Sequence, residues 1–255
     1  MTAVSVWNRS VWSLAGVLLV ACGGAPPPPP VEAAPPPPPV RAEPTVVQAS
    51  QELGSIDEMA TNHTFEGLTS KFLDCQKQGM ERVEFLAGDA RFFLRIAQDG
   101  TVRWAYLEDS TLGDRDTEKC MLQVVSSAHW PQPDGGEAEV QKSISFDSGD
   151  ARPPVSWRSD KVANVLLQEG SDALKCKGAT RGTFKVTAYV QPGDPDAHPH
   201  KGHKHAETAH GKVMAVGVAP PNKDGESKSD CIVDAVKDWK MPSPGGYAAK
   251  VTFTL

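Results

Sequence analysis

The sequence predicts an α+β fold made of two tandem repeats that follow a disordered, proline-rich stalk. Each repeat is expected to run helix, strand, strand, helix, strand and to form a small antiparallel sheet. Three observations predict this fold: a cysteine-led amphipathic run that ends in proline and Gly-Gly occurs twice, alternating strand patterns precede each run, and eleven prolines lie within residues 26–44. The expected boundaries are a signal peptide at 1–21, a lipidated linker at 22–50, and repeats at 51–150 and 151–255.

The amino terminus has the pattern of a bacterial secretory signal. Arg9 is its only charge, and the apolar run at 11–21 is about a dozen residues long, shorter than the about 20 that a membrane span needs. Leu19-Val20-Ala21-Cys22 resembles the lipobox of bacterial lipoproteins, which implies acylation of Cys22 and anchoring to a membrane. In those lipoproteins a residue such as Gly23 after the cysteine favours delivery to the outer membrane, and we expect the protein to face the periplasm. The alternative is an ordinary cleavage site with a chance cysteine.

The stalk contains two runs of five prolines, at 26–30 and 35–39. Proline fixes φ and lacks a backbone donor, so this stretch favours polyproline II and is excluded from helices and sheets. At about 3.1 Å per residue, residues 26–44 would reach roughly 60 Å. We expect a semi-rigid spacer, and a ligand for a proline-recognition domain is the alternative.

The repeat is clearest around two cysteines, Cys120 and Cys231. A proline lies 11 residues after each, at Pro131 and Pro242, a second proline follows two residues later, and Gly-Gly comes next. The run from cysteine to proline is amphipathic in both copies, so we expect a helix that the proline ends. A strand-like tail then reaches Phe146 in the first copy and Leu255 in the second.

The remaining elements come from periodicity and turn residues. Asp99-Gly100 suits a two-residue type I′ hairpin turn, in which both central residues have positive φ. The carboxylates near the helix starts, Asp114 and Asp116 among them, and the segment 227–230 are expected to cap helices. The expected helices are Phe65–Gln78 and Val162–Lys175, and the expected hairpin strands are Arg91–Ile96 with Thr101–Leu107 and Thr183–Val190 with Lys212–Val218.

This pattern resembles the AgmX/PglI carboxy-terminal domain of gliding-motility-associated proteins, which is itself similar to the carboxy-terminal domain of TonB-type energy transducers. The resemblance is best over 91–146 and 212–255, and Met241 departs from it where the domain usually has an aromatic residue. It implies an envelope protein linked to motility or transport machinery. No membrane helix precedes the stalk, unlike in energy transducers, which speaks against direct coupling to an inner-membrane motor. The matching residues are Asp99, Gly100, Ser110, Leu112, Cys120, Pro131, Cys231, Trp239, Pro242, Pro244, Gly245 and Gly246.

Four cysteines remain once Cys22 is assigned to the lipid. An exported chain meets an oxidising compartment, and four cysteines allow three pairings. The repeat favours Cys75–Cys120 and Cys176–Cys231, one bridge in each copy. Buried free thiols are the alternative, and no C-x-x-C motif suggests a redox role.

Five of the seven histidines lie in the loop 194–210, between the two strands of the second hairpin. Imidazole is a common ligand of Zn, Ni and Cu, so this loop is the candidate metal site. A solvated insertion with incidental affinity is the favoured interpretation, because the loop lacks a rigid scaffold. The candidate ligands are His198, His200, His203, His205 and His210.

Composition and missing motifs narrow the function. A formal net charge of −6 argues against nucleic-acid binding. No nucleophile elbow, phosphate loop or dinucleotide fingerprint occurs in the sequence, so we expect that the protein is not an enzyme. Trp130 and Trp239 are expected in the core. The expected function is that of a non-enzymatic, membrane-anchored envelope lipoprotein that binds an unknown envelope protein, through strand addition at an exposed sheet edge. The alternative is a periplasmic metal-binding lipoprotein.

Overall fold

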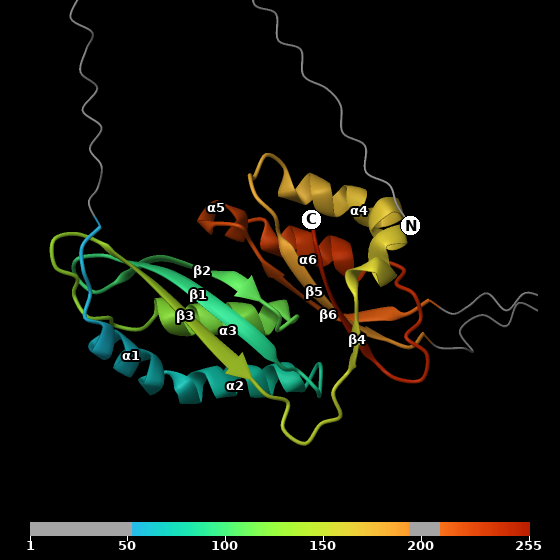
Figure 1. The fold of residues 1–255 in the computed structure, drawn as a ribbon, viewed down its shortest axis with the longest axis horizontal. Coiled ribbons are helices and arrows are strands. Elements are labelled where there is room, and N and C mark those ends of the chain that lie inside the picture. The colour runs from blue at the N-terminus through green and yellow to red at the C-terminus, as the bar shows by residue number, and fades with distance from the viewer. Residues whose placement is uncertain (1–52, 194–209) are drawn as a thin grey trace, which may run out of the picture. The chain divides into compact units, whose positions relative to one another are not determined.

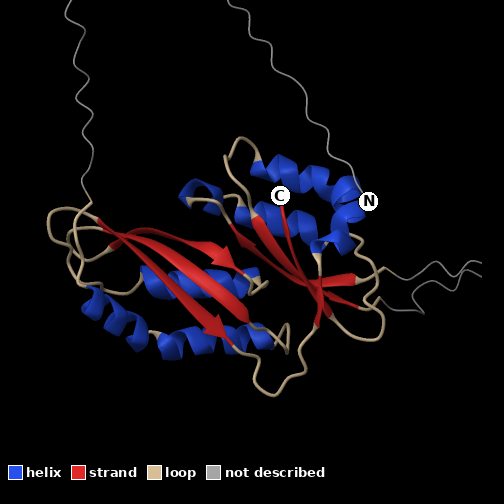
Figure 2. Ribbon diagram, viewed as in Figure 1, coloured by secondary structure: helices blue, strands red, loops and turns tan. Residues whose placement is uncertain are grey.

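Two small sheets and the helices packed on them make up the part of the protein that the computed structural model describes, residues 53–193 and 210–255 (Figures 1 and 2). The fold is mixed α+β, as the sequence predicts. The expected signal peptide, the stalk and nearly all of the histidine loop lie outside the described residues.

The first half of the described chain forms a three-stranded antiparallel sheet in the order β2-β1-β3. Its helices bury their apolar residues against one face of this sheet, where Phe65 lies 4.7 Å from Trp130 and Phe72 lies 5.4 Å from Phe92, measured between ring centroids. Trp130 is a core residue, as expected, and its indole Nε1 donates to the carbonyl oxygen of Val125. The elements are α1 (Glu58–Gly67), α2 (Thr69–Met80), β1 (Gly88–Ile96), β2 (Val102–Ser110), α3 (Arg115–Ser126) and β3 (Ala138–Phe146).

The prediction of a single helix at Phe65–Gln78 is wrong, because the chain forms two helices there. The first begins earlier, where the Asp57 side chain accepts a hydrogen bond from the N–H of Ala60, and the two are separated at Leu68. The apolar face that predicted the helix is nevertheless correct, since Phe65, Phe72 and Cys75 are each only 2% exposed.

The two-residue turn expected at Asp99-Gly100 is also wrong. Ala97 N–H donates to the Thr101 carbonyl and Gly100 N–H donates to the Ala97 carbonyl, so three residues form the loop. Gly100 has φ of 79°, the left-handed position that closes such three-residue hairpins. The Asp99 carboxylate accepts hydrogen bonds from the backbone and the hydroxyl of Thr101 and stabilises the turn.

The second half forms a four-stranded sheet in the order β4-β7-β5-β6. β4 pairs with β7 in parallel, so this sheet is mixed and the expectation of a purely antiparallel sheet is wrong. The N-cap of α6 is Lys228, inside the cap region expected at 227–230, but its side chain makes no capping hydrogen bond. The elements are β4 (Val155–Trp157), the 3-10 helix η1 (Ser159–Val162), α4 (Ala163–Lys177), β5 (Lys185–Gln191), β6 (Lys212–Ala219), α5 (Lys223–Glu226), α6 (Ser229–Lys237) and β7 (Ala249–Thr254).

A third cluster of buried residues joins the two halves. Phe85 of the first half lies 5.7 Å from Tyr189 and 5.8 Å from Tyr247, measured between ring centroids. The Ala87 carbonyl accepts hydrogen bonds from the Tyr189 hydroxyl at 3.0 Å and from Lys250 Nζ at 2.6 Å. Burial lowers the pKa of Lys250 to about 8. Both apolar packing and polar contacts therefore connect the halves.

Candidate interaction surface

The residues expected to carry a lipid or a metal lie almost entirely outside the described part of the chain. Cys22, His198, His200, His203 and His205 are not described, and His210 is exposed at the start of the segment that leads into β6. Among residues 53–193 and 210–255, no group of three or more His, Cys, Asp or Glu side chains is placed to hold a metal ion. No helix in these same ranges is long and apolar enough to cross a membrane.

Two disulfides tie together the helices that cover each sheet, and they are the two pairings that the repeat favours. Cys75 on α2 is bonded to Cys120 on α3, with Cα atoms 5.7 Å apart. Cys176 on α4 is bonded to Cys231 on α6, with Cα atoms 5.6 Å apart. Each bridge joins a helix that precedes the central hairpin to the helix that follows it, so the pair of helices is fixed over its sheet.

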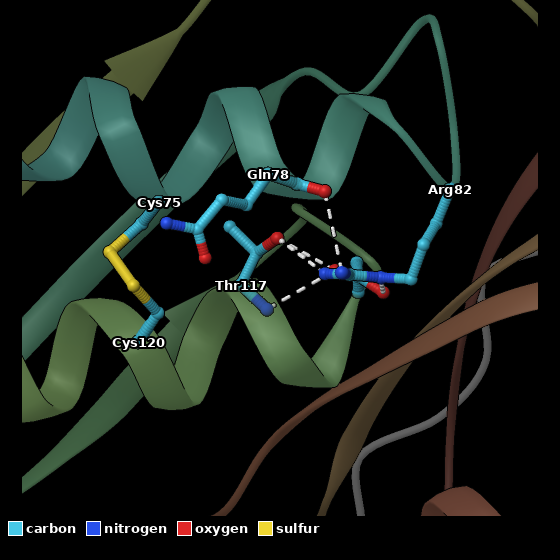
Figure 3. The surroundings of a disulfide bond; sticks show 6 residues. Cys75, Gln78, Arg82, Thr117 and Cys120 are labelled. Carbon is cyan, nitrogen blue, oxygen red and sulfur yellow. Dashed lines mark hydrogen bonds and ion pairs between the residues drawn. A yellow bond between two sulfur atoms is a disulfide. The ribbon is translucent and has the colours of Figure 1, made fainter.

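A polar clamp lies at the amino-terminal end of α3, close to the first disulfide (Figure 3). The guanidinium of Arg82 pairs with Asp114, the N-cap residue of α3, and donates to the Thr117 hydroxyl at 3.3 Å and to the Gln78 carbonyl at 3.3 Å. The hydrogen bond to Asp114 raises the pKa of Arg82 above its ordinary value. The predicted capping role of Asp114 is confirmed, since its carboxylate accepts the Thr117 N–H.

A buried carboxylate that was not predicted from the sequence lies between the two sheets. Glu118 on α3 is 0% exposed, and it accepts hydrogen bonds from the Ser110 hydroxyl at 2.7 Å and from the Val218 N–H of β6 at 3.0 Å. Burial raises the pKa of Glu118 to about 7. A signal was present, because Glu118 lies three and four positions before the buried Met121 and Leu122, which places it on the apolar face of α3.

A charged cluster surrounds this junction. Arg115, which is 6% exposed, donates to Glu226 at 2.6 Å and to Asp230 at 2.8 Å. Lys119 also reaches Asp230, at 3.0 Å. Burial raises the pKa of Glu226, whereas the hydrogen bond from Arg115 lowers that of Asp230. The cations come from the first half and the carboxylates from the second, so the cluster holds the two halves together.

These contacts cover one edge of each sheet. β2 lies beside β5 and β6, and Lys185 on β5 donates to the Asp109 carboxylate on β2 at 2.6 Å. The Val218 N–H at the edge of β6 is bonded by Glu118. The edges formed by β2 and β6 therefore face each other rather than solvent.

The opposite edge of the first sheet is β3, which is nine residues long and pairs with β1 on one side. Asp89 of β1 and Ala97, the residue directly after this strand, form backbone hydrogen bonds on the side of β2. Because the direction alternates along an antiparallel strand, the even-numbered residues of β1 bond toward β3. Because Ala90 pairs with Ile144, the backbone N–H and C=O groups of the even-numbered residues of β3 point toward β1. The odd-numbered Glu137, directly before β3, follows the same alternation, because its carbonyl points away from β1 and accepts the N–H of Gly54. Within the described ranges, no strand pairs with the outward backbone groups of Glu139, Gln141, Ser143 and Ser145.

Comparisons of the chain with protein-family models, with curated proteins and with solved structures find no match. The case for a function therefore depends on the residues and on the geometry just described.

Proposed function

We propose that this chain is a lipid-anchored protein of the bacterial envelope that binds a protein partner by strand addition to β3 and has no catalytic role. The observation that carries the proposal is the row of outward backbone N–H and C=O groups along β3. Unpaired edges of this kind bind extended segments through main-chain hydrogen bonds. The other edges of the two sheets are less suited, since β2 and β6 face each other and β4 is only three residues long.

The proposed module is a repeat, with one copy in each half of the described chain. The order α2, β1, β2, α3, β3 corresponds to α4, β5, β6, α6, β7, and the strand order β2-β1-β3 corresponds to β6-β5-β7. The equal spacing from cysteine to proline and the equivalent disulfides support the same correspondence. In this proposal both copies are AgmX/PglI-like domains, similar to TonB carboxy-terminal domains, which fits a role in motility or envelope transport.

The proposed anchor is a lipid on Cys22, with the protein at the outer membrane and facing the periplasm. The lipobox-like sequence directly after the apolar run supports it. Cys22→Ser is expected to abolish labelling by radioactive palmitate and to move the protein from the membrane fraction to the soluble fraction. Unchanged labelling of Cys22→Ser would refute the anchor.

Site-specific photo-crosslinking in living cells tests the partner interaction. A photoreactive benzoylphenylalanine replaces Gln141 on the outward edge of β3, and in the control it replaces Leu167 on α4, which is 84% exposed. A defined adduct is expected from position 141 and not from position 167. Ser143→Pro in the same chain should remove the adduct, because proline deletes an outward donor while leaving the bonds to β1. An adduct that persists in Ser143→Pro would refute strand addition.

A second candidate function is metal binding by the histidine loop. Gln191 and Lys212 pair directly at the ends of β5 and β6, so the five histidines lie in one segment whose two ends are held together. Calorimetry with Zn, Cu and Ni on the whole chain and on a deletion of residues 194–209 tests this role. Submicromolar affinity that the deletion abolishes would support it, and weak affinity that survives the deletion would refute it.

A further inference from the structure

A cavity lies directly beside the free edge of β3. Its volume is about 300 Å³, and α2 forms one wall while the end of β3 forms the other. Leu73 on α2 is 53% exposed and is one of the large hydrophobic residues that the described chain leaves exposed. The lining residues are Thr69, Phe72, Leu73 and Gln76 from α2, and Ile144, Ser145, Phe146 and Asp147 from β3 and the residue after it.

Four of the eight lining residues are apolar, namely Phe72, Leu73, Ile144 and Phe146. The polar Gln76, which is 5% exposed, already has hydrogen-bond partners. Gln76 Nε2 donates to the Leu86 carbonyl at 3.0 Å and to the Asp147 carbonyl at 2.7 Å. These bonds fix Gln76 at the base of the cavity and use both of its amide hydrogens. The cavity therefore suits an apolar side chain better than a polar one.

The register of β3 brings the cavity within reach of an added strand. Even-numbered side chains of β3, including Ile144, face the helices, while the backbone groups of odd-numbered residues face outward. In a strand paired with this edge, every second side chain lies on the same face as Ile144. One of these side chains would therefore be placed over the cavity, next to Leu73.

The second half of the chain shows how an added strand packs in this fold. β4 pairs with the outer edge of β7 along Val155–Trp157, and Trp157 packs against the core cluster beneath α4. β7 corresponds to β3 in the repeat. An added strand at this edge thus contributes both main-chain hydrogen bonds and a large apolar side chain on the helix-covered face.

We propose that the partner of β3 is an extended peptide segment that inserts one large apolar side chain, of the size of leucine or phenylalanine, into the cavity between α2 and β3. This inference rests on the proposed function and specifies its partner. The peptide side chains at the intervening positions lie on the face of the sheet away from the helices, beside Glu139, Gln141 and Ser143, where polar residues are accommodated. In the partner sequence, every second residue should therefore be polar. Among the intervening residues, which face the helices, one position should require a large apolar side chain.

Selection from a peptide library tests this proposal with the whole chain. The probe is a library of acetylated octapeptides that carry threonine at four alternate positions and random residues at the other four. Enriched peptides are expected to share leucine, isoleucine, methionine or phenylalanine at one random position. Their affinity should fall at least tenfold for Leu73→Glu and stay unchanged for the control Leu167→Glu, which places the same charge on an exposed leucine of α4.

The outcomes separate this inference from the proposed function. Peptides that bind Ser143→Pro as tightly as wild type would refute strand addition, and the cavity proposal with it. Loss of binding in Ser143→Pro, combined with equal affinity for Leu73→Glu and no apolar preference, would refute the cavity proposal alone. Dimerisation that Ser143→Pro abolishes would identify a second copy as the occupant and overturn the proposal. Slow amide exchange at Gln141 and Ser143 in a monomer without peptide would show that the chain occupies its own edge, which also overturns it.

Discussion

The carboxylate of Glu118 on α3 accepts a hydrogen bond from the backbone N–H of Val218 on β6, 3.0 Å away, although 100 residues separate the two in sequence. The carboxylate takes the position that a neighbouring strand would otherwise occupy at that edge of β6. One buried acid thus satisfies an edge donor of the second sheet and attaches that sheet to the first half of the chain.

Stability should fall as the pH rises through the pKa of Glu118. Burial raises this pKa from its ordinary value of 4.5 to about 7, so the folded protein binds the proton more tightly than the unfolded chain does. The resulting stabilisation is complete below pH 4.5 and is lost as the pH rises through 7. Glu118→Gln keeps the shape without the charge: its carbonyl oxygen can still accept the Val218 N–H, while its amide would donate to the Ser110 hydroxyl oxygen. At pH 8 the free energy of unfolding of this variant should be on the order of 3 kcal/mol higher than that of wild type. Urea titrations at pH 5 and pH 8 measure this difference.

The control for this prediction is Glu66→Gln, because the Glu66 side chain is 77% exposed on α1. It should change stability little at either pH. Equal pH dependence of wild type and Glu118→Gln would contradict the assignment of the pH effect to Glu118.

Removal of Arg115 should destabilise the chain strongly. Arg115→Ala leaves the partly buried Glu226 without its cation. Removing one partner of a fully buried pair costs about 3–5 kcal/mol, and the loss here should be smaller because the Glu226 side chain is 23% exposed. The double variant Arg115→Ala with Glu226→Ala should be more stable than the sum of the single effects predicts. Arg158→Ala, at a side chain that is 88% exposed, is the matched control and should change stability little. Strict additivity of the double variant, measured by urea unfolding, would show that the two side chains are not coupled.

The two disulfides should stabilise the chain by similar amounts. They close loops with sequence separations of 45 and 55, which correspond to about 4 kcal/mol each in the chain-entropy model. Replacing Cys75 and Cys120 by serine, or Cys176 and Cys231, should lower the free energy of unfolding by that order. Peptide mapping of the oxidised protein checks the pairing itself, and a bridge found between the two halves would contradict it.

Gly100→Ala should destabilise the first hairpin more than a similar change elsewhere. Gly100 and Gly135 have the same φ of 79°, so alanine is strained at both positions. At Gly100 the added Cβ would also collide with the Trp130 carbonyl, whereas at Gly135 it meets no atom within 4 Å. Gly135→Ala should cost about 1–2 kcal/mol and Gly100→Ala clearly more, as thermal unfolding would show. Equal losses would mean that the Trp130 contact relaxes without cost.

The sequence predicted those parts of the fold that depend on local pattern. Apolar periodicity identified the buried face of α2 around Phe72 and Cys75, and the repeated spacing indicated the cysteine pairs. The break at Leu68 was not predictable from periodicity, because both helices keep their apolar residues on one face. β4 was missed because three residues show no clear alternation, and the strand exists through pairing with Ala249–Val251, far along the chain.

The interaction surface was less predictable than the fold. Glu118 on the apolar face of α3 was a visible signal of a buried charge, but its partner Val218 was not, since a local pattern carries no information about pairing over 100 residues. Which edges are covered depends on how the two halves pack, because these contacts cover β2 and β6 and leave β3 without a second neighbouring strand among the described residues. Strand addition followed from the fold class, whereas the particular edge required the structure.

The ladder between β5 and β6 remains paired to Gln191 and Lys212, the residues nearest the segment that joins the two strands. The free energy of closing a loop grows only with the logarithm of its length, by about 0.6 kcal/mol for each doubling. The hairpin should therefore tolerate inserts of very different length and composition at this point. Such a permissive position would accept an affinity tag or a small reporter domain, and natural variation should accumulate there faster than in the strands that flank it.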